Sequence, residues 1–434
     1  MKSIKVGLIG FGTIGSGMVK ILQDNQKIIK ERLGASVDVI KIADLDITTD
    51  RGVKVESGIL TTDANEVLDH PDIVVVIELM GGYEPARSFI LKAIKNKKHV
   101  VTANKALLAK YGEEVFSAAE KNNVGIGFEA SVGGAIPIIR SIKEAFVANR
   151  IQAIEGIMNG TANYILSKMS DGDHDFGAVL KEAQDKGYAE ADPTFDIEGI
   201  DSAHKIAVLT RLAYGMPVSL DDIYVQGISS ISKLDIKCAR EFGYRIKLLA
   251  ISKFDGKTID VRVHPAMISE SKPMANVNGV LNAIMVRDDL MGENILVGHG
   301  AGSLPTGSAV VADVVEIARN MISGAQDRVP LQSFQKSSVQ GIPLKDMSEI
   351  EGKYYLRFWV LDKPGVLSHI SGILGNHDIS IESVIQRIKD DNGQGVPLVM
   401  MTHDASEKNI QAALKEINDM EEVLEKTVLI RVEK

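Results

Sequence analysis

The sequence predicts an α/β protein in three parts: a parallel-sheet domain, a mixed α+β domain and a small βαββαβ module at the C-terminal end. The first third alternates short apolar runs with helical patterns, which is typical of a parallel sheet covered on both faces. The middle carries strand-like segments between helical stretches. The final segment follows the order strand, helix, strand, strand, helix, strand, which is ferredoxin-like.

The composition is that of an ordinary globular chain. Hydrophobic residues make up 45% and charged residues 25% of the 434 residues, and the net charge is -9. This negative charge argues against nucleic acid as a partner, because phosphate binding needs basic patches. No apolar run approaches the roughly 20 residues that span a bilayer, and the N-terminus lacks the layout of a signal peptide. We therefore expect a cytoplasmic protein without a membrane partner.

The first element is a strand that runs directly into a glycine-rich turn. Residues 6–9 form an apolar run, Gly10, Gly12 and Gly15 follow in the pattern G-x-G-x-x-G, and residues 16–29 have a helical pattern. The glycines permit a tight turn and let the backbone approach a pyrophosphate at the N-terminus of the helix. The position of the pattern between a strand and a helix predicts a Rossmann-type domain that binds a dinucleotide.

The second strand, residues 37–43, ends at Asp44. An acidic residue at this place accepts hydrogen bonds from the 2′-hydroxyl of an adenine ribose and repels a 2′-phosphate, which favours NAD over NADP. Arg51 and Lys54 follow closely and are able to serve a phosphate, so NADP stays open. The structural alternative is that Asp44 only ends the strand.

Two more strands extend the parallel sheet, at residues 72–78 and 98–105, and Thr102, Asn104 and Lys105 end the second one. The ligand crevice of an open α/β sheet lies outside the carboxyl ends of the strands. We therefore expect Thr102, Asn104 and Lys105 to face a cofactor or a substrate. A solvated surface lysine is the alternative.

A further strand, residues 124–129, leads through a glycine-rich turn into a helix over 138–147. Glycines beside the carboxylate of Glu129 are able to turn backbone carbonyls toward a hard cation, which prefers oxygen ligands. From the residues alone, a plain strand-to-helix turn is the simpler interpretation.

The middle of the chain predicts a substrate platform. A strand at 150–158 precedes a turn in which Thr161 either caps the next helix or meets a ligand. Further strands at 257–264, 283–287 and 294–298 predict an open, largely antiparallel sheet with helices on one face. Such a sheet commonly forms a subunit interface, so we expect a homodimer or homotetramer.

The single cysteine, Cys238, lies in a predicted helix over 234–242 with no obvious base beside it. It excludes an internal disulfide and a cysteine metal cluster. We interpret it as a buried structural thiol.

A signature stretch runs from Ala183 to Lys205, where acidic side chains crowd behind Gly187 and one lysine follows. Asp201 and Lys205 are four residues apart, so a helix places them on one face. A carboxylate cluster is able to bind an ammonium group, and a lysine near a carbonyl is able to donate a proton. The alternative is a solvated acidic loop with an ordinary surface ion pair.

A second glycine-rich turn, residues 298–307, precedes an apolar helix over 309–322. Glycines at a helix start are able to approach the nicotinamide or its phosphates, and we expect the helix to pack on the first domain. The predicted domains are 1–137 for dinucleotide binding (completed by about 305–325), 138–304 for substrate binding and dimerisation, 326–352 as a linker, and 353–434 as the C-terminal module.

These motifs resemble those of the homoserine dehydrogenase family over essentially the whole chain. The signature stretch contains the family's D-P-x-x-D-I-x-G-x-D-x-x-x-K, residues 101–105 read V-T-A-N-K, and residues 298–306 read G-x-G-A-G-x-x-P-T. The C-terminal module resembles an ACT domain, with D-K-P-G-V-L at 362–367 and N-H-D-I-S-I at 376–381. ACT domains typically bind amino acids and act as regulatory modules.

The resemblance implies that the protein reduces L-aspartate 4-semialdehyde to L-homoserine with NAD(P)H, on the route to threonine and methionine. It makes threonine a candidate effector at the ACT domain. It also implies that Lys205 donates the proton, that Lys105 borders cofactor and substrate, and that Glu190 and Asp201 hold the substrate's ammonium group. The remaining implied contacts are the phosphate loop (Phe11, Thr13, Ile14), the nicotinamide end (Gly187, Gly302), and a sodium ion on Glu129 and the backbone oxygens of Val132, Gly134 and Ile136.

Elementary chemistry agrees with a lysine as proton donor. Hydride addition to an aldehyde builds negative charge on oxygen, which an ammonium group stabilises and then protonates. In the reverse direction the same lysine must be neutral, from a reference pKa of about 10.4. Burial or a second lysine lowers that pKa, whereas Asp201 raises it. We therefore expect alkaline pH to favour homoserine oxidation.

Two rival functions were weighed against this one. An acyl-forming semialdehyde dehydrogenase shares the glycine pattern but needs a nucleophilic cysteine. Cys238 lacks a suitable setting for that role. A catalytically inert amino-acid sensor of the ACT type is the second rival, and the intact Lys105, Glu190, Asp201 and Lys205 argue against it.

Overall fold

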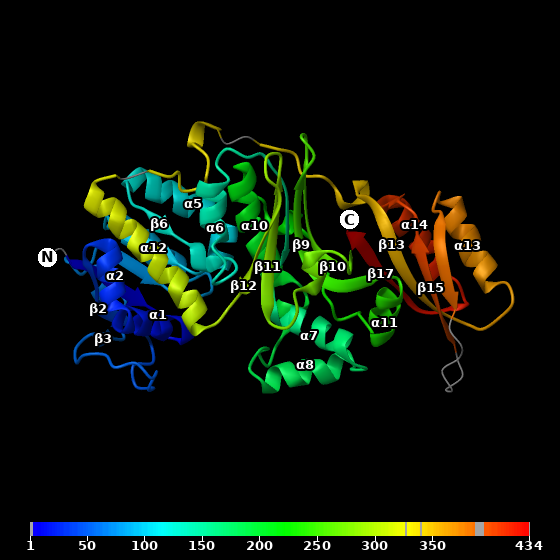
Figure 1. Cartoon of the computed structure of the whole chain (residues 1–434), viewed down its shortest axis with the longest axis horizontal. Coiled ribbons are helices and arrows are strands. Elements are labelled where there is room, and N and C mark those ends of the chain that lie inside the picture. Colours follow the sequence, from blue (N-terminus) through cyan, green and yellow to red (C-terminus); the bar gives the residue numbers. More distant parts are fainter. Residues whose placement is uncertain (1–2, 326–327, 339–340, 387–394, 434) are drawn as a thin grey trace. The chain divides into compact units, whose positions relative to one another are not determined.

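A computed structural model describes residues 3–325, 328–338, 341–386 and 395–433 (Figure 1). Parts of the predicted linker, residues 326–327 and 339–340, lie outside this range, as does the loop 387–394. The chain divides into two compact units. The first unit comprises Met1–Gly160, Asp201–Ile223 and Leu281–Ile342, and the second comprises Thr161–Ile200, Tyr224–Val280 and Pro343–Lys434.

The first unit contains a six-stranded parallel sheet in the order β3-β2-β1-β4-β5-β6. Its central strands are buried apolar runs, as the sequence predicts, while β3 was not predicted. The chain reverses its direction of strand addition between β1 and β4, which is the place where such sheets bind ligands. The strands are β1 (Ser3–Ile9), β2 (Ser36–Ala43), β3 (Leu60–Thr61), β4 (Val75–Glu78), β5 (His99–Thr102) and β6 (Ile126–Gly127).

Helices connect these strands and cover the sheet. The helix predicted over 16–29 is wrong in its bounds, because it begins at Thr13 and breaks at Asn25 into two helices. The helices of the first unit are α1 (Thr13–Asp24), α2 (Gln26–Leu33), α3 (Asn65–Leu68), α4 (Ala86–Lys95), α5 (Lys105–Asn122), α6 (Ile138–Arg140) with the π-turn η2 (Ser141–Ala145), α10 (Ile200–Tyr214) and α12 (Ser303–Ser323).

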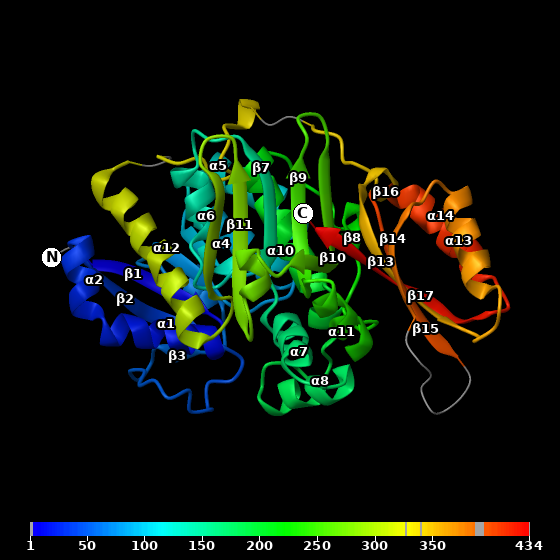
Figure 2. The same ribbon diagram turned by 45° about the vertical axis from the view of Figure 1, so that its right-hand side comes forward.

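Helix α12, yellow in Figure 1, packs against α1, and the turned view in Figure 2 agrees. The two helices approach closely at glycines: a Cβ on Gly307 would lie only 3.0 Å from the backbone nitrogen of Met18. The Ser303 hydroxyl donates to the carbonyl oxygen of Thr13 at 2.7 Å. The second glycine-rich turn is therefore held against the first turn of α1.

The first unit also contains an antiparallel sheet of three strands, in the order β7-β11-β12. Residues such as Ala153, Ile154 and Ile284 are fully buried in it. All three strands were predicted, and their bounds are β7 (Ile151–Ile157), β11 (Leu281–Asp288) and β12 (Gly292–His299).

The second unit is built on a mixed sheet with the strand order β9-β10-β17-β13-β15-β14. Strand β9 was not predicted, and β10 extends beyond the predicted strand 257–264. The strands are β9 (Tyr244–Phe254), β10 (Ile259–Ser269), β17 (Val423–Glu433), β13 (Glu351–Val360), β15 (Val396–Thr402) and β14 (Ile381–Gln386), with short β8 (Tyr224–Val225) beside β10 and β16 (Ala405–Ser406) beside β13.

The C-terminal module has the predicted order of elements, and its strands lie as β17-β13-β15-β14 over a core that includes Tyr354, Phe358 and Ile410. Its last strand also pairs in parallel with β10, with Ala266 opposite Arg431. The sheet of the module therefore continues into the platform sheet within this unit. The helices are α7 (Gly160–Asp171), α8 (Phe176–Asp185), α9 (Thr194–Ile197), α11 (Lys233–Glu241), α13 (Val366–Asn376) and α14 (Glu407–Asn418).

These elements confirm the predicted fold class: a Rossmann-type parallel sheet, a mixed α+β region and a ferredoxin-like module. Within the described ranges, no helix combines the length and the apolar character that crossing a bilayer requires.

Candidate active site

A cluster of two lysines around one carboxylate lies in the first unit. The i,i+4 spacing on α10 brings the Nζ of Lys205 to 2.6 Å from Oδ2 of Asp201. The same Nζ donates to the backbone carbonyl of Met158 at 2.6 Å. Lys105, the first residue of α5, places its Nζ 3.1 Å from Oδ1 of Asp201. Asn159 donates its side-chain amide to Oδ2 of Asp201 at 2.9 Å.

Burial decides how these charges behave. The residues Asp201 and Lys205 are 4% and 8% exposed, whereas 31% of the Lys105 side chain is exposed. Burial alone would raise the pKa of the Asp201 carboxyl, but Lys205 and Lys105 outweigh it and hold the pKa well below its usual range. Asp201 is therefore ionised, and two ammonium groups share its charge. Lys105 is the more exposed of the two lysines.

The other half of the signature stretch belongs to the second unit. Gly187 follows α8 with a φ of +73°, a conformation that favours glycine. The Thr161 hydroxyl donates to the carbonyl of Tyr188 at 2.5 Å, and the amide of Gln184 donates to the carbonyl of Glu190 at 3.1 Å. These bonds fasten the loop to α7 and α8. The Glu190 side chain is exposed, and Thr161, Gly187 and Glu190 belong to the second unit, whereas the lysine cluster belongs to the first.

The glycine-rich loop has the geometry of a tight turn before α1. Gly10 has a φ of +98°, and a Cβ on Gly15 would collide with the carbonyl of Gly10. Gly12 precedes the first residue of α1, Thr13, and a Cβ there would meet nothing, so space is open beside it. Phe11 and Ile14 flank these positions in the chain. The loop thus presents backbone amides at a helix N-terminus, which suits a phosphate group.

Asp44 is tied to this loop. Its carboxylate accepts the backbone N–H of Phe11 through Oδ2 and that of Asp46 through Oδ1, the latter at 2.9 Å. Arg51, the cation that the sequence offered for a 2′-phosphate, lies 3.1 Å from the carboxylate of Asp46 instead. Two carboxylates, Asp44 and Asp46, therefore follow the end of β2, and Arg51 is paired with Asp46.

Thr102 turns inward rather than toward a crevice. It is fully buried, and its hydroxyl donates to Oε2 of Glu78 at 2.6 Å. The backbone N–H of Asn104 donates to that hydroxyl, and the Asn104 side chain caps α5 by accepting from Leu107 at 3.1 Å. Burial raises the pKa of the Glu78 carboxyl. This network fixes the position of the first turn of α5, which begins at Lys105.

Glu129 caps a helix. Its two carboxylate oxygens accept the backbone N–H groups of Ile139 and Arg140, each at 2.9 Å. Its own N–H donates to the carboxylate of Asp313, and burial together with Glu129 raises the pKa of Asp313 to about 7. A cavity of about 110 Å³ borders both carboxylates.

The turn after Glu129 carries the three predicted backbone ligands, Val132, Gly134 and Ile136. Gly133 and Gly134 adopt positive φ angles, and the carbonyl of Ile136 accepts from Ile138 at 2.8 Å. Among the described residues, no three His, Cys, Asp or Glu side chains come together as a metal site.

Sequence reasoning missed three partners of the site: Glu78, Met158 and Asn159. Asn159 stands just past β7 as Asn104 stands just past β5, and polar residues after a strand were a usable signal. Met158 acts through its backbone carbonyl, for which its side chain gives no signal. Glu78 ends a buried strand, where a carboxylate needs hydrogen-bond donors.

The sequence profiles of three protein families match the chain. Residues 10–129 match the NAD-binding domain of homoserine dehydrogenases, residues 137–315 match the homoserine dehydrogenase family, and residues 354–422 match the ACT domain.

Curated relatives and solved structures agree with these matches. The chain is 46% identical to a homoserine dehydrogenase of Neisseria gonorrhoeae and 43% identical to one of Pseudomonas aeruginosa, over 100% of this chain and 99% of each relative. The solved homoserine dehydrogenase of Thiobacillus denitrificans superposes with a TM-score of 0.93 at 44% identity, covering 100% of this chain and 99% of that one.

Proposed function

The chain belongs to the homoserine dehydrogenase family, whose reaction is the nicotinamide-dependent reduction of L-aspartate 4-semialdehyde to L-homoserine, and we propose that this reaction takes place at the cluster of Lys105, Asp201 and Lys205. The observation that carries the proposal is the fixed position of Lys205. Its ammonium group is buried, and it is oriented from two sides by a carboxylate and a backbone carbonyl.

Lys205 donates the proton to the aldehyde oxygen. The bound nicotinamide supplies the hydride, and negative charge develops on that oxygen as the hydride arrives. An ammonium group held within a largely dry site stabilises such charge far better than water does. Lys105 adds a second positive charge on the exposed side, where a substrate enters. In the reverse direction Lys205 accepts the proton of the homoserine hydroxyl.

Asp201 has two tasks in this proposal. Its carboxylate orients Lys205 and Lys105, and together with Glu190 it attracts the ammonium group of the substrate. Glu190 is held through its backbone carbonyl by Gln184 of α8 and is itself exposed, which suits a side chain that meets a ligand. Thr161 and Gly187 set the path of the loop that carries Glu190.

We propose NAD as the preferred cofactor. Gly10, Gly12, Phe11, Thr13 and Ile14 form the loop for the pyrophosphate, and Gly302 lies at the start of α12 near this loop. Asp44 is available to the ribose hydroxyls at the end of β2. A 2′-phosphate would meet the negative charges of Asp44 and Asp46, since Arg51 is paired.

A sodium ion is proposed at Glu129 with the carbonyls of Val132, Gly134 and Ile136. A carboxylate and backbone carbonyls are hard oxygen donors, and each oxygen of Glu129 keeps a second lone pair beside the amide that it accepts. The ion would stabilise the turn that leads into α6.

We further propose a homodimer or homotetramer that a free amino acid such as threonine regulates at the ACT domain. The three-stranded sheet β7-β11-β12 offers an interface, because β12 lies at its edge with Val297 half exposed. The predicted domain division, with residues 353–434 as the regulatory part, belongs to this proposal.

The most informative experiment is homoserine oxidation followed by cofactor absorbance. The assay uses NAD against NADP, each with and without threonine, in sodium chloride and in choline chloride. We expect faster turnover with NAD, inhibition by threonine, and more activity at alkaline pH because the oxidation releases a proton. Equal rates with both cofactors would refute the role of Asp44, and no turnover with either would refute the role of the lysine cluster.

A further inference from the structure

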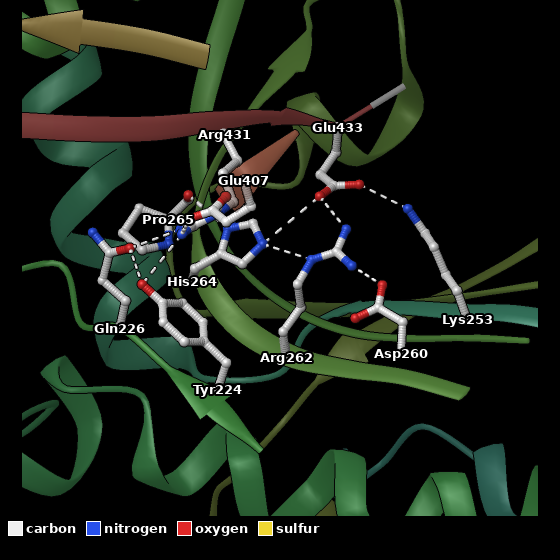
Figure 3. A network of polar contacts seen from close by, with 10 residues as sticks. All are labelled: Tyr224, Gln226, Lys253, Asp260, Arg262, His264, Pro265, Glu407, Arg431 and Glu433. Carbon is white, nitrogen blue, oxygen red and sulfur yellow. Dashed lines mark hydrogen bonds and ion pairs between the residues drawn. The ribbon is translucent and has the colours of Figure 1, made fainter. Parts of the chain in front are cut away.

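The last strand of the chain, β17, ends in a dense group of buried charges (Figure 3). Arg431 and Glu433 are two residues apart, so they project from the same face of the strand. Both are almost fully buried, at 4% and 8% exposed. The chain therefore places its C-terminal charges in the interior of the second unit rather than in water.

Arg431 connects three separate segments. Its guanidinium makes a two-point bond with the carboxylate of Glu407, at 2.9 and 2.5 Å, which fixes the start of α14. Its Nη1 donates to the side-chain oxygen of Gln226 at 2.9 Å, and its Nη2 lies 3.3 Å from the hydroxyl of Tyr224. The guanidinium also stands over the ring of Tyr224 at 4.8 Å. The C-terminal module thus holds strand β8 and the residue that follows it.

The segment beyond β8 lies directly against the signature stretch. The N–H of Ile228 donates to the carbonyl of Ile197 at 2.8 Å. A Cβ on Gly227 would lie 2.6 Å from that same carbonyl oxygen, so only glycine permits this approach. A Cβ on Gly199 would likewise lie 3.2 Å from the side chain of Val225. Residues 225–228 and 197–199 therefore have no free space between them.

Glu433 fixes the register of the strand that carries Arg431. Its carboxylate lies 2.7 Å from the Nη2 of Arg262 and 2.7 Å from the Nζ of Lys253. Arg262 also donates to Nε2 of His264 at 3.0 Å, which leaves the proton of the neutral ring on Nδ1, facing the carbonyl of Pro265. These bonds join β17 to β10 and β9, so Arg431 has a defined place opposite Ala266.

From this continuous line of contacts we propose that Arg431 is a positioning residue for the reaction: it holds residues 225–228 against the signature stretch and thereby sets the place of the loop between α8 and α9, which carries Glu190. The inference rests on the proposed role of that stretch in substrate binding. A displacement of Gln226 would also displace Ile197, because the chain segments are in close contact at Gly199 and Gly227. A displacement of about 1 Å near a bound substrate is enough to cost about 100-fold in rate.

The decisive variants are Arg431→Met and Gln226→Leu, with Arg357→Met as the matched control. Arg357 is also a buried arginine of the C-terminal module, and it pairs with Asp235 of α11 at 2.7 and 3.2 Å. It contacts none of residues 224–228 in the described structure. Gln226→Leu removes one of the two acceptors that residues 224–226 offer to Arg431, while the pair with Glu407 stays in place.

We expect Arg431→Met and Gln226→Leu to raise the KM for homoserine about tenfold while the KM for the nicotinamide cofactor changes less than twofold. Arg431→Lys keeps the charge but not the two-point geometry, and it should restore only part of the KM. Arg357→Met should lower the melting temperature without raising the KM for homoserine. If Arg431→Met does not fold, Gln226→Leu decides the matter.

Two results would overturn the inference. The first is an unchanged KM for homoserine in Gln226→Leu together with an unchanged KM in any folded Arg431 variant. The second is an equal rise of the KM in Arg357→Met, which would make the effect one of general stability. A failure of the proposed function is distinguishable from both, because the wild-type protein would then not oxidise homoserine.

Discussion

Two buried charge clusters in this molecule differ in the kind of cation that they use. The cluster of Lys105, Asp201 and Lys205 has two lysines around one carboxylate. The cluster around β17, with Arg262, Arg431, Glu407 and Glu433 as its centre, matches arginines with carboxylates. A lysine is able to lose its proton near a substrate, whereas an arginine stays protonated in proteins.

The two clusters also differ in how their cations and carboxylates are paired. In the lysine cluster, two lysines share the carboxylate of Asp201, and Lys105 is partly exposed. In the arginine cluster, Arg431 pairs with Glu407, Arg262 pairs with both Glu433 and Asp260, and the group is buried. The lysine cluster therefore suits a change of charge during a reaction, whereas the arginine cluster suits charges that stay constant. This difference also gives the two clusters different expected responses to mutation and to pH.

The largest expected effect is on turnover in the lysine cluster. Lys205→Ala removes the proton donor, so kcat for homoserine oxidation should fall about 1,000-fold, within the usual range for general acid catalysis. The dissociation constant for NADH, measured by fluorescence titration, should change less than threefold because Lys205 contacts Asp201 and Met158. Lys20→Ala removes an exposed i,i+4 pair with Asp24 and serves as the control, with an expected change below twofold. An equal loss of turnover and of NADH binding would contradict the assignment.

The lysine cluster is the region that the sequence predicted best. Asp201 and Lys205 stand four apart on one helix, and this spacing alone brings the two side chains together. Lys105 follows a parallel strand, and the shared edge of such a sheet explains its place. The carbonyl of Met158 was not predictable in this way, since every residue has one. Local periodicity therefore located the side chains of the lysine cluster, while the backbone partner came only from the fold.

Almost nothing of the arginine cluster was predicted from the sequence. Arg431 meets Gln226, which is 205 positions away along the chain, and no spacing rule connects them. Strand β9 was missed for a related reason, because Lys247 interrupts the apolar run of this strand and is nevertheless buried. Buried charges that are satisfied by distant partners look like surface residues until the fold is known.

The second prediction concerns the stability of the arginine cluster. Glu433→Gln leaves Arg262 and Lys253 without their shared carboxylate, which should cost about 3 kcal/mol at pH 7. Burial alone would raise the pKa of Glu433, but Arg262 and Lys253 outweigh it and hold that pKa well below its usual range.

The pH dependence of this loss follows from the depressed pKa. The stabilisation by Glu433 is complete above the pKa of the unfolded chain, about 4.3, and is lost as the pH falls below it. The difference in melting temperature between wild type and Glu433→Gln should therefore shrink from pH 5 to pH 3. Glu382→Gln, which breaks the exposed pair with Lys353, is the control and should cost less than about 1 kcal/mol. A pH-independent difference would refute the charge-based account.

Lys247 is a third buried cation, and among the described residues its hydrogen-bond acceptors are amide and backbone oxygens rather than carboxylates. Its Nζ donates to the carbonyl of Val277 at 2.6 Å and to the amide oxygens of Asn163 and Asn278. Burial and the nearby Arg245 lower its pKa to about 8. From pH 8 to about 10.5 the unfolded chain binds this proton more tightly than the folded one, so folded stability rises with pH in that window.

Between pH 7 and pH 9, the free energy of unfolding of wild type should rise by roughly 1 kcal/mol relative to that of Lys247→Met. Urea unfolding at both pH values measures it, with Lys186→Met as the exposed control, for which no such gain is expected. A constant difference between wild type and Lys247→Met would show that the lysine is not strained by its burial.

The smallest effect is expected at Cys238, a buried residue of α11 that belongs to neither cluster. A dehydrogenase that forms an acyl intermediate needs an accessible thiolate, whereas Cys238 is fully buried. Cys238→Ser should therefore keep kcat within twofold and lower stability by about 1 kcal/mol, because a buried hydroxyl replaces a weakly polar thiol. Stopped assays of homoserine oxidation, run beside Lys205→Ala, measure the change in kcat. Urea unfolding measures the change in stability. A Cys238→Ser variant that folds but is inactive would show that the reaction depends on the Cys238 thiol, and it would refute the assignment of the reaction to the lysine cluster.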